Sequence, residues 1–79
     1  MPRFYFHLHN TLDVPDEEGQ ELPSIEAALR YAEICARVEV VETLKVTGRM
    51  SLGHRIDIGD DQGSVIDTIW FRDVVSIED

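Results

Sequence analysis

The sequence is poor in three things that a small protein can use to reinforce itself or to build a site: cysteine, basic residues and long apolar runs. It has 79 residues and a single cysteine, Cys35, which excludes a disulfide within the chain. No apolar run approaches the about 20 residues that a membrane helix needs, so we expect no membrane partner. The opening segment lacks the layout of a signal peptide, and a lone cysteine fits a reducing compartment, so we expect a cytoplasmic protein.

Basic residues are outnumbered by acidic ones, seven against sixteen, which gives a formal net charge of −9. Such a field repels nucleic acid at long range and attracts a basic protein. We therefore expect no nucleic-acid partner. The acidic residues that could face a basic protein partner lie in two predicted loops: Asp16, Glu17, Glu18, Asp60 and Asp61.

Motifs that carry chemistry are missing as well. The sequence has no glycine-rich phosphate loop and no set of serine, histidine and aspartate at a catalytic spacing. Cys35 has no histidine near it in the sequence, which is typical of a small buried residue rather than a nucleophile. His7 and His9 share one strand face, but a metal would need a further ligand such as His54. We predict a protein without catalytic activity, metal, cofactor or small-molecule substrate.

The periodicity of apolar residues predicts one α+β domain over residues 1–79. Its expected architecture is a small antiparallel sheet of order β-β-α-β-β, packed on one face against a single long helix. Residues 4–9 are rich in aromatic residues and predict a first strand, with Phe4, Phe6 and Leu8 on one face and Tyr5, His7 and His9 on the other.

Shorter segments complete the predicted sheet. Residues 12–15 and 20–22 are interpreted as a weakly paired return of the first strand, and residues 54–71 as a β-hairpin. The pattern leaves open whether Asp67 or Thr68 of the hairpin faces the core. The C-terminal tail is expected to dock on the domain through its apolar residues, Val74, Val75 and Ile77.

The helix is expected to be the longest element. Ser24 is a preferred N-cap, and Gly48 is a preferred stop because glycine adopts the left-handed conformation that ends many helices. The helix should therefore run from about Ile25 to Val46 or Thr47.

Two apolar stripes run along nearly opposite sides of this helix. We assign the first, which is centred on alanines, to the core: Ile25, Ala28, Leu29, Ala32, Ala36 and Val40. The second stripe has the heptad spacing of a helix–helix seam: Ala27, Tyr31, Ile34, Val38 and Val41. Because a helix on a small sheet buries one face, we predict that the second stripe forms a homodimer or binds another protein. The alternatives are that other parts of the chain such as the 72–79 tail cover it, that it consists of ordinary scattered exposed apolar side chains, or that the two stripes are reversed.

Several segments together resemble a family of very short alphaproteobacterial proteins, common in rhizobial lineages, that carry a domain of unknown function. They are residues 1–8, residues 16–23, the alanine-rich helix and residues 63–75. The resemblance implies a bacterial cytoplasmic protein with one domain, and it brings no activity or catalytic residue with it. The second stripe departs from the more charged helix that the family leads us to expect.

A shorter stretch is similar to HicB-type antitoxins. These also place a Val-Pro-Asp-like segment before a serine-led helix, here Val14–Asp16 and Ser24–Leu29. The similarity suggests an alternative function, an acidic inhibitor or antitoxin that neutralises a basic partner through the two acidic loops.

Overall fold

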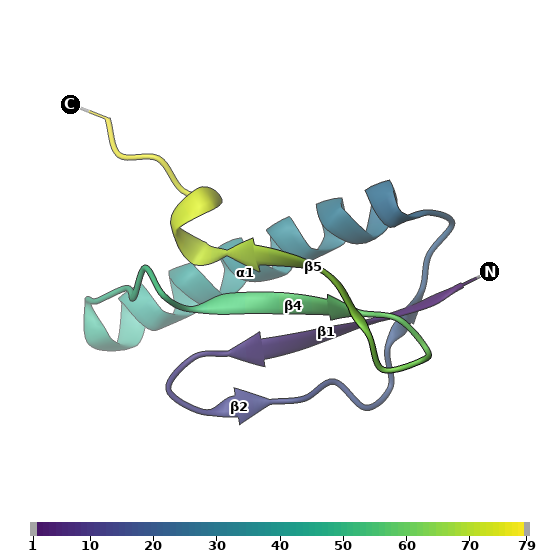
Figure 1. Ribbon diagram of the computed structural model, residues 1–79. Coiled ribbons are helices and arrows are strands. Elements are labelled where there is room, and N and C mark those ends of the chain that lie inside the picture. The colour runs from purple at the N-terminus through teal and green to yellow at the C-terminus, as the bar shows by residue number, and fades with distance from the viewer. Residues whose placement is uncertain (1, 79) are drawn as a thin grey trace.

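Strand β1 (Arg3–His9) is the strand around which the sheet is built. The computed structural model describes residues 2–78 and shows an antiparallel sheet of order β2-β1-β4-β5, with β3 also paired to β1 (Figure 1). The other elements follow in chain order: β2 (Asp13–Val14), β3 (Gln20–Glu21), α1 (Ile25–Thr47), β4 (Arg55–Gly59), β5 (Val65–Trp70) and the 3-10 helix η1 (Phe71–Asp73).

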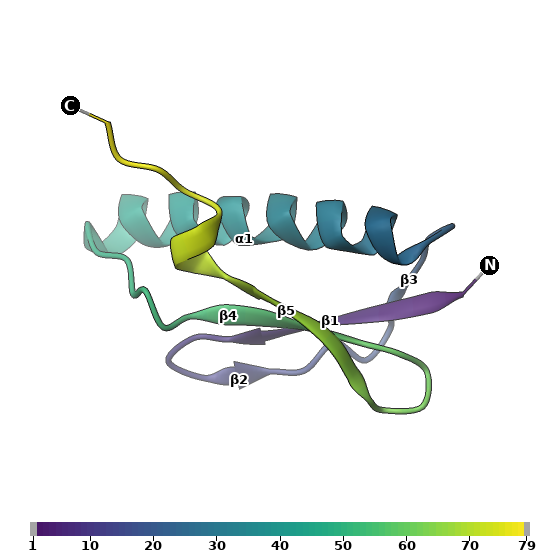
Figure 2. The same cartoon turned by 45° about the horizontal axis from the view of Figure 1, so that its top comes forward.

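Helix α1 lies across one face of this sheet and forms a second layer (Figure 2). The predicted α+β architecture is thereby confirmed. The predicted second strand is split into two short pieces, β2 opposite Leu8 and His9 and β3 opposite Arg3 and Phe4. The loop between these pieces, residues 15–19, interrupts a single antiparallel return of the chain along β1.

The two ends of α1 are capped as the sequence predicts. Ser24 accepts a hydrogen bond from the backbone N–H of Ala27 at 3.1 Å. At the other end Gly48 adopts φ +69°, and its N–H donates to the carbonyl of Leu44 at 2.9 Å. These caps set the observed limits of the helix at Ile25 and Thr47.

The core lies between the alanine stripe and the inner face of the sheet. Ala28, Ala32 and Ala36 have no exposed surface, and Val40 is also buried. They meet the buried side chains of the sheet and of η1, which are Phe4, Ile56, Ile58 and Phe71. Our assignment of Ile25 to the core is wrong, because this first residue of the helix lies at the end of the contact and is exposed.

The β4–β5 hairpin answers the question that the sequence left open. Ile56 pairs with Ile69 on the core side of the sheet, and in the same register Ile58 pairs with Asp67. Asp67 nevertheless stays exposed, because β5 is an edge strand of the sheet and its first half is solvated. Thr68 lies on the opposite, outer face.

The tail after η1 docks only in part. Val74 and Val75 pack against the core, and the carbonyl of Val74 accepts a hydrogen bond from Nε of Arg37 at 3.1 Å. The expectation for Ile77 is wrong, since this side chain is 94% exposed. No helix within residues 2–78 is both long and apolar enough to cross a membrane.

Gly19 provides a test of how the return strand is held against β1. It is buried with φ +72°, and a Cβ placed there would lie 2.8 Å from the carbonyl oxygen of Phe4. Gly63 has φ +83° with nothing within 4 Å of the same position. We expect Gly19→Ala to lower the free energy of unfolding by about 2–4 kcal/mol and Gly63→Ala by about 1 kcal/mol, measured by urea unfolding. Equal losses of free energy of unfolding in the two variants would contradict the close approach of Gly19 to the backbone of Phe4.

Candidate interaction surface

The second stripe of α1 leaves apolar side chains in solvent. Ile34, Val38 and Val41 are 59%, 54% and 50% exposed. They point away from the buried alanines, so the two stripes are not reversed. The docked part of the tail leaves these three side chains uncovered within the described chain. Ala27 is half-buried.

Tyr31 departs from the rest of the stripe by leaning over the sheet. Its ring packs against that of Phe6, with 4.7 Å between centroids and a tilt of 52°. The side of the helix that carries Tyr31 therefore joins the inner face of β1. Together they line an open groove of about 500 Å³. Its apolar lining consists of Phe6, Leu8, Tyr31, Ile34, Cys35, Val38 and Ile56, and its polar lining of Asp16, Gln20 and Glu39.

Cys35 is a half-buried free cysteine that borders this groove. Burial raises the pKa of its thiol, the hydrogen bond with the Tyr31 hydroxyl acts to lower it, and the carboxylates of Glu39 and Asp16 act to raise it. Burial likewise raises the pKa of the Tyr31 hydroxyl. Most of the groove lining is apolar, so the groove offers mainly apolar side chains for contact.

The acidic residues predicted to face a partner fall into two groups: some carboxylates accept hydrogen bonds from their own loops, and the others remain exposed. Asp16 is half-buried, and its Oδ1 accepts the backbone N–H groups of Gly19 at 3.1 Å and Glu18 at 3.2 Å. Its Oδ2 accepts the N–H of Phe6 at 3.1 Å. Burial acts to raise the pKa of Asp16, but these hydrogen bonds, helped by nearby His7, outweigh burial and hold the pKa below its usual value. Asp16 thus ties the loop to β1.

In the turn of the β4–β5 hairpin, an aspartate likewise accepts hydrogen bonds from the backbone of its own loop. Oδ1 of Asp60 accepts the backbone N–H groups of Gln62 and Ser64, both at 2.9 Å. Glu17, Glu18 and Asp61 remain exposed. Because Gln20 pairs with Phe4 and Gly59 pairs with Tyr5, the two acidic loops lie at the same end of the sheet.

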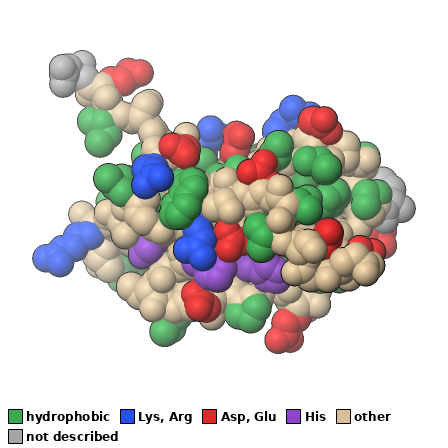
Figure 3. Space-filling view, viewed as in Figure 1, with side chains coloured by type: hydrophobic (Ala, Val, Ile, Leu, Met, Phe, Trp, Pro, Cys, Tyr) green, Lys and Arg blue, Asp and Glu red, His purple; other side chains and the backbone are tan. Residues whose placement is uncertain are grey.

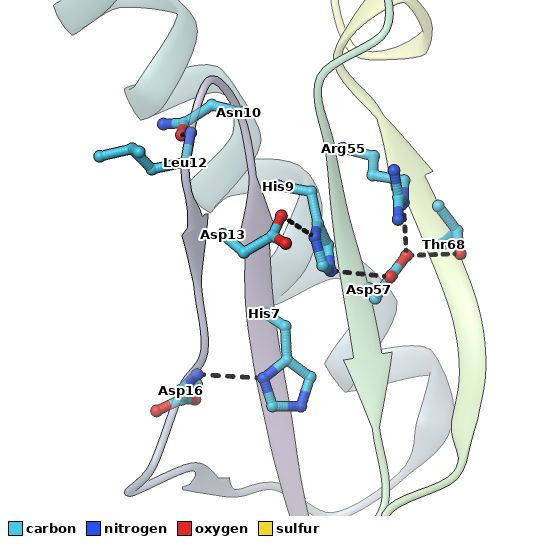
Figure 4. A network of polar contacts seen from close by, with 9 residues as sticks. All are labelled: His7, His9, Asn10, Leu12, Asp13, Asp16, Arg55, Asp57 and Thr68. Atoms are coloured by element: carbon cyan, nitrogen blue, oxygen red, sulfur yellow. Dashed lines mark hydrogen bonds and ion pairs between the residues drawn. The ribbon is translucent and has the colours of Figure 1, made fainter.

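The outer face of the sheet, opposite to α1, carries a polar network that the sequence pattern did not reveal (Figure 4). Asp57 is its centre, a carboxylate with 9% exposure. Its Oδ1 accepts from Nε of Arg55 at 3.2 Å and from the hydroxyl of Thr68 at 2.9 Å. Its Oδ2 lies 3.0 Å from Nε2 of His9, whose Nδ1 lies 2.7 Å from Oδ1 of Asp13.

This network changes how the paired histidines are interpreted. Both ring nitrogens of His9 face carboxylate oxygens, and Nδ1 of His7 accepts the backbone N–H of Asp16 at 3.0 Å. Figure 3 shows the histidine side chains gathered across the outer face, with basic and acidic groups beside them. Within residues 2–78, no group of three or more His, Cys, Asp or Glu side chains is arranged to hold a metal ion.

Trp70 completes the outer face beside this network. The guanidinium groups of Arg55 and Arg72 lie 5.6 Å and 4.9 Å from its ring. Its neighbour Phe71 turns into the core instead. Sequence reasoning missed the network because it depends on cross-strand register. The one available signal was the polar alternation of His7 and His9 along β1.

Taken together, the fold and its surfaces define a small α+β domain with one apolar helix face in solvent and an internally bonded polar sheet face. The chain belongs to the family described as Domain of unknown function (DUF6894), whose model matches residues 3–72. No similar curated protein and no similar solved structure was found.

Asp16 generates a pH-dependent prediction. Because its folded pKa is lowered, its contribution is present above the unfolded pKa and is lost as pH falls through the folded pKa. We expect Asp16→Asn to lower the free energy of unfolding by about 1–3 kcal/mol at about pH 7, since an amide cannot accept from all three N–H groups. The free energy of unfolding of Asp16→Asn should fall less than that of the wild type as the pH is lowered from about 5 to about 2.5.

The matched control for Asp16 is Glu17→Gln, which removes the same charge from an exposed neighbour. Urea unfolding across this pH range should show that the free energy of unfolding of the control changes with pH as it does in the wild type. If Asp16→Asn also kept the pH dependence of the wild type, the structural role of the carboxylate would be contradicted.

The outer-face network is tested by Asp57→Asn, with Asp67→Asn as the exposed control on the adjacent strand. An amide at position 57 keeps one acceptor oxygen, but its NH₂ group faces donors. We expect a loss of about 1–3 kcal/mol at position 57 and a change within about 0.5 kcal/mol at position 67, by thermal or urea unfolding. A neutral effect at Asp57 would show that the network contributes nothing to stability.

Proposed function

We propose that this protein is a non-catalytic interaction domain that associates with itself through the second stripe of α1. The observation that carries the proposal is the exposure of Ile34, Val38 and Val41, which form one apolar ridge at heptad spacing. Exposed apolar residues are ordinary when scattered, but a continuous row on the most accessible side of a helix is typical of a contact surface.

The charge of the chain supports this choice of surface. Most acidic residues lie outside α1, whereas the helix carries Arg30, Arg37 and Lys45 among its acids. Two copies that meet through α1 bring together helices whose own charges nearly balance, with three basic residues against four acidic ones. The net charge of −9 therefore opposes this association less than it would oppose contact through the loops.

The size of the domain supports an association too. A chain of about 80 residues buries a small fraction of its surface, and oligomerisation is a common way to add to its core. We place the protein in the cytoplasm on the basis of its single cysteine, and in bacteria on the basis of the resemblance described above. An inhibitor that binds a basic protein through Glu17, Glu18 and Asp61 is the competing outcome of the test below.

The test is the mass in solution by light scattering over a range of protein concentrations. We expect the wild type to form dimers as concentration rises. Val38→Glu should raise the dissociation constant at least about tenfold, because it places a carboxylate in an apolar contact. The fold should remain, since Val38 is half exposed and surface changes have small effects on stability.

The matched control is Val46→Glu, the same substitution on the same helix at a side chain that is 82% exposed and off the stripe. Its dissociation constant should equal that of the wild type. A wild type that stays monomeric at every concentration would contradict self-association. Salt-sensitive capture of a basic protein that survives Val38→Glu would favour the inhibitor.

A further inference from the structure

The second stripe contains a shallow hollow that could receive a side chain of a facing helix. It measures about 240 Å³ and is lined by four residues of α1: Arg37, Val38, Val41 and Glu42. In heptad terms Val38 and Val41 are seam positions, and Arg37 and Glu42 are the positions that flank the seam on either side. In a pair of helices with this spacing, each seam side chain inserts between residues of the facing helix, and the flanking residues can form ion pairs across the seam.

The flanking charges decide between the two ways of pairing such helices. In a parallel pair each flank of one helix meets the opposite flank of the other, so Arg37 faces Glu42 of the second copy, and the reverse. In an antiparallel pair like flanks meet, and Arg30 and Arg37 of one copy would face the same arginines of the other. Only the parallel pair sets opposite charges together.

Both flanking side chains have capacity for this contact. Arg37 uses Nε to hold the carbonyl of Val74, and no hydrogen bond from its terminal nitrogens is present among the described residues. Glu42 lies 3.7 Å from Lys45 of its own helix through one oxygen, Oε1. Its other oxygen can accept from a second copy.

We propose that the occupant of the second stripe is a second copy of this chain with its helix parallel, held by two reciprocal ion pairs between Arg37 and Glu42. The inference rests on the proposed function, since it specifies the geometry of that self-association. The apolar seam extends from Ala27 to Val41, and Lys45 at the next seam position marks its end. The contact is a short helix-packing patch between two globular domains.

Charge exchange tests the ion pairs. Arg37→Glu and Glu42→Arg should each raise the dissociation constant about tenfold at low salt, because each creates two like-charge contacts. The double variant should return to within about threefold of the wild type, since it restores both pairs with reversed polarity. The matched control is Arg30→Glu, on the same flank one heptad earlier, where the facing residue is the uncharged Cys35. This control should leave the dissociation constant within about twofold.

Disulfide trapping tests the orientation independently. In a Cys35→Ser background, Ile34→Cys and Val41→Cys lie about 10 Å apart along the helix. In a parallel pair each residue faces itself, so both variants should form a cross-linked dimer under a mild oxidant. In an antiparallel pair the two-fold axis passes near one of these positions at most, so one variant at most would cross-link.

The outcomes separate the two proposals. Cross-linking at both positions together with recovery in the double charge variant supports the parallel pair. A dimer that cross-links at one position or neither, or that the double variant fails to restore, overturns the parallel geometry and leaves self-association standing. A wild type that remains monomeric at all concentrations overturns both.

Discussion

The contact between the alanine face of α1 and the inner face of the sheet is the constraint on which the structure depends. Ala28, Ala32 and Ala36 have no exposed surface, and their small side chains let the helix lie close to Ile56 and Ile58. A helix held at such short range is fixed in its rotation about its own axis, because any turn would drive a larger side chain into the sheet. The rotation of the helix thus determines which residues reach solvent.

The exposed stripe is the direct consequence of that fixed rotation. Because the alanines take the buried side, Ile34, Val38 and Val41 are turned away from the sheet. Tyr31 lies between the two sides and packs on Phe6, so it joins the stripe to the groove along β1. The same apolar content that makes the sequence globular is therefore divided between a core and a surface.

The two outward faces of the molecule differ in their remaining capacity for contact. On the sheet, Asp57 bonds to Thr68 and Arg55 and contacts His9, so its carboxylate is already surrounded by partners. Asp16 and Asp60 likewise use their carboxylates on the backbone of their own loops. The net charge therefore overstates the number of acids free to meet a partner. On α1, Ile34, Val38 and Val41 stay exposed among the described residues, so this face keeps its capacity for contact.

The sequence by itself determined the helix, its caps and the alternation of β1, because these depend on local preferences: Ser24 accepts a nearby N–H, Gly48 adopts positive φ, and side chains alternate along a strand. It also gave both stripes, since helical spacing is a local property. Only the tertiary structure decided which stripe is buried, that Asp67 is solvated while Asp57 is enclosed, and that Ile77 stays exposed. These outcomes depend on how far the helix extends over the sheet and on the register between β1, β4 and β5, which are distances between residues far apart in the chain.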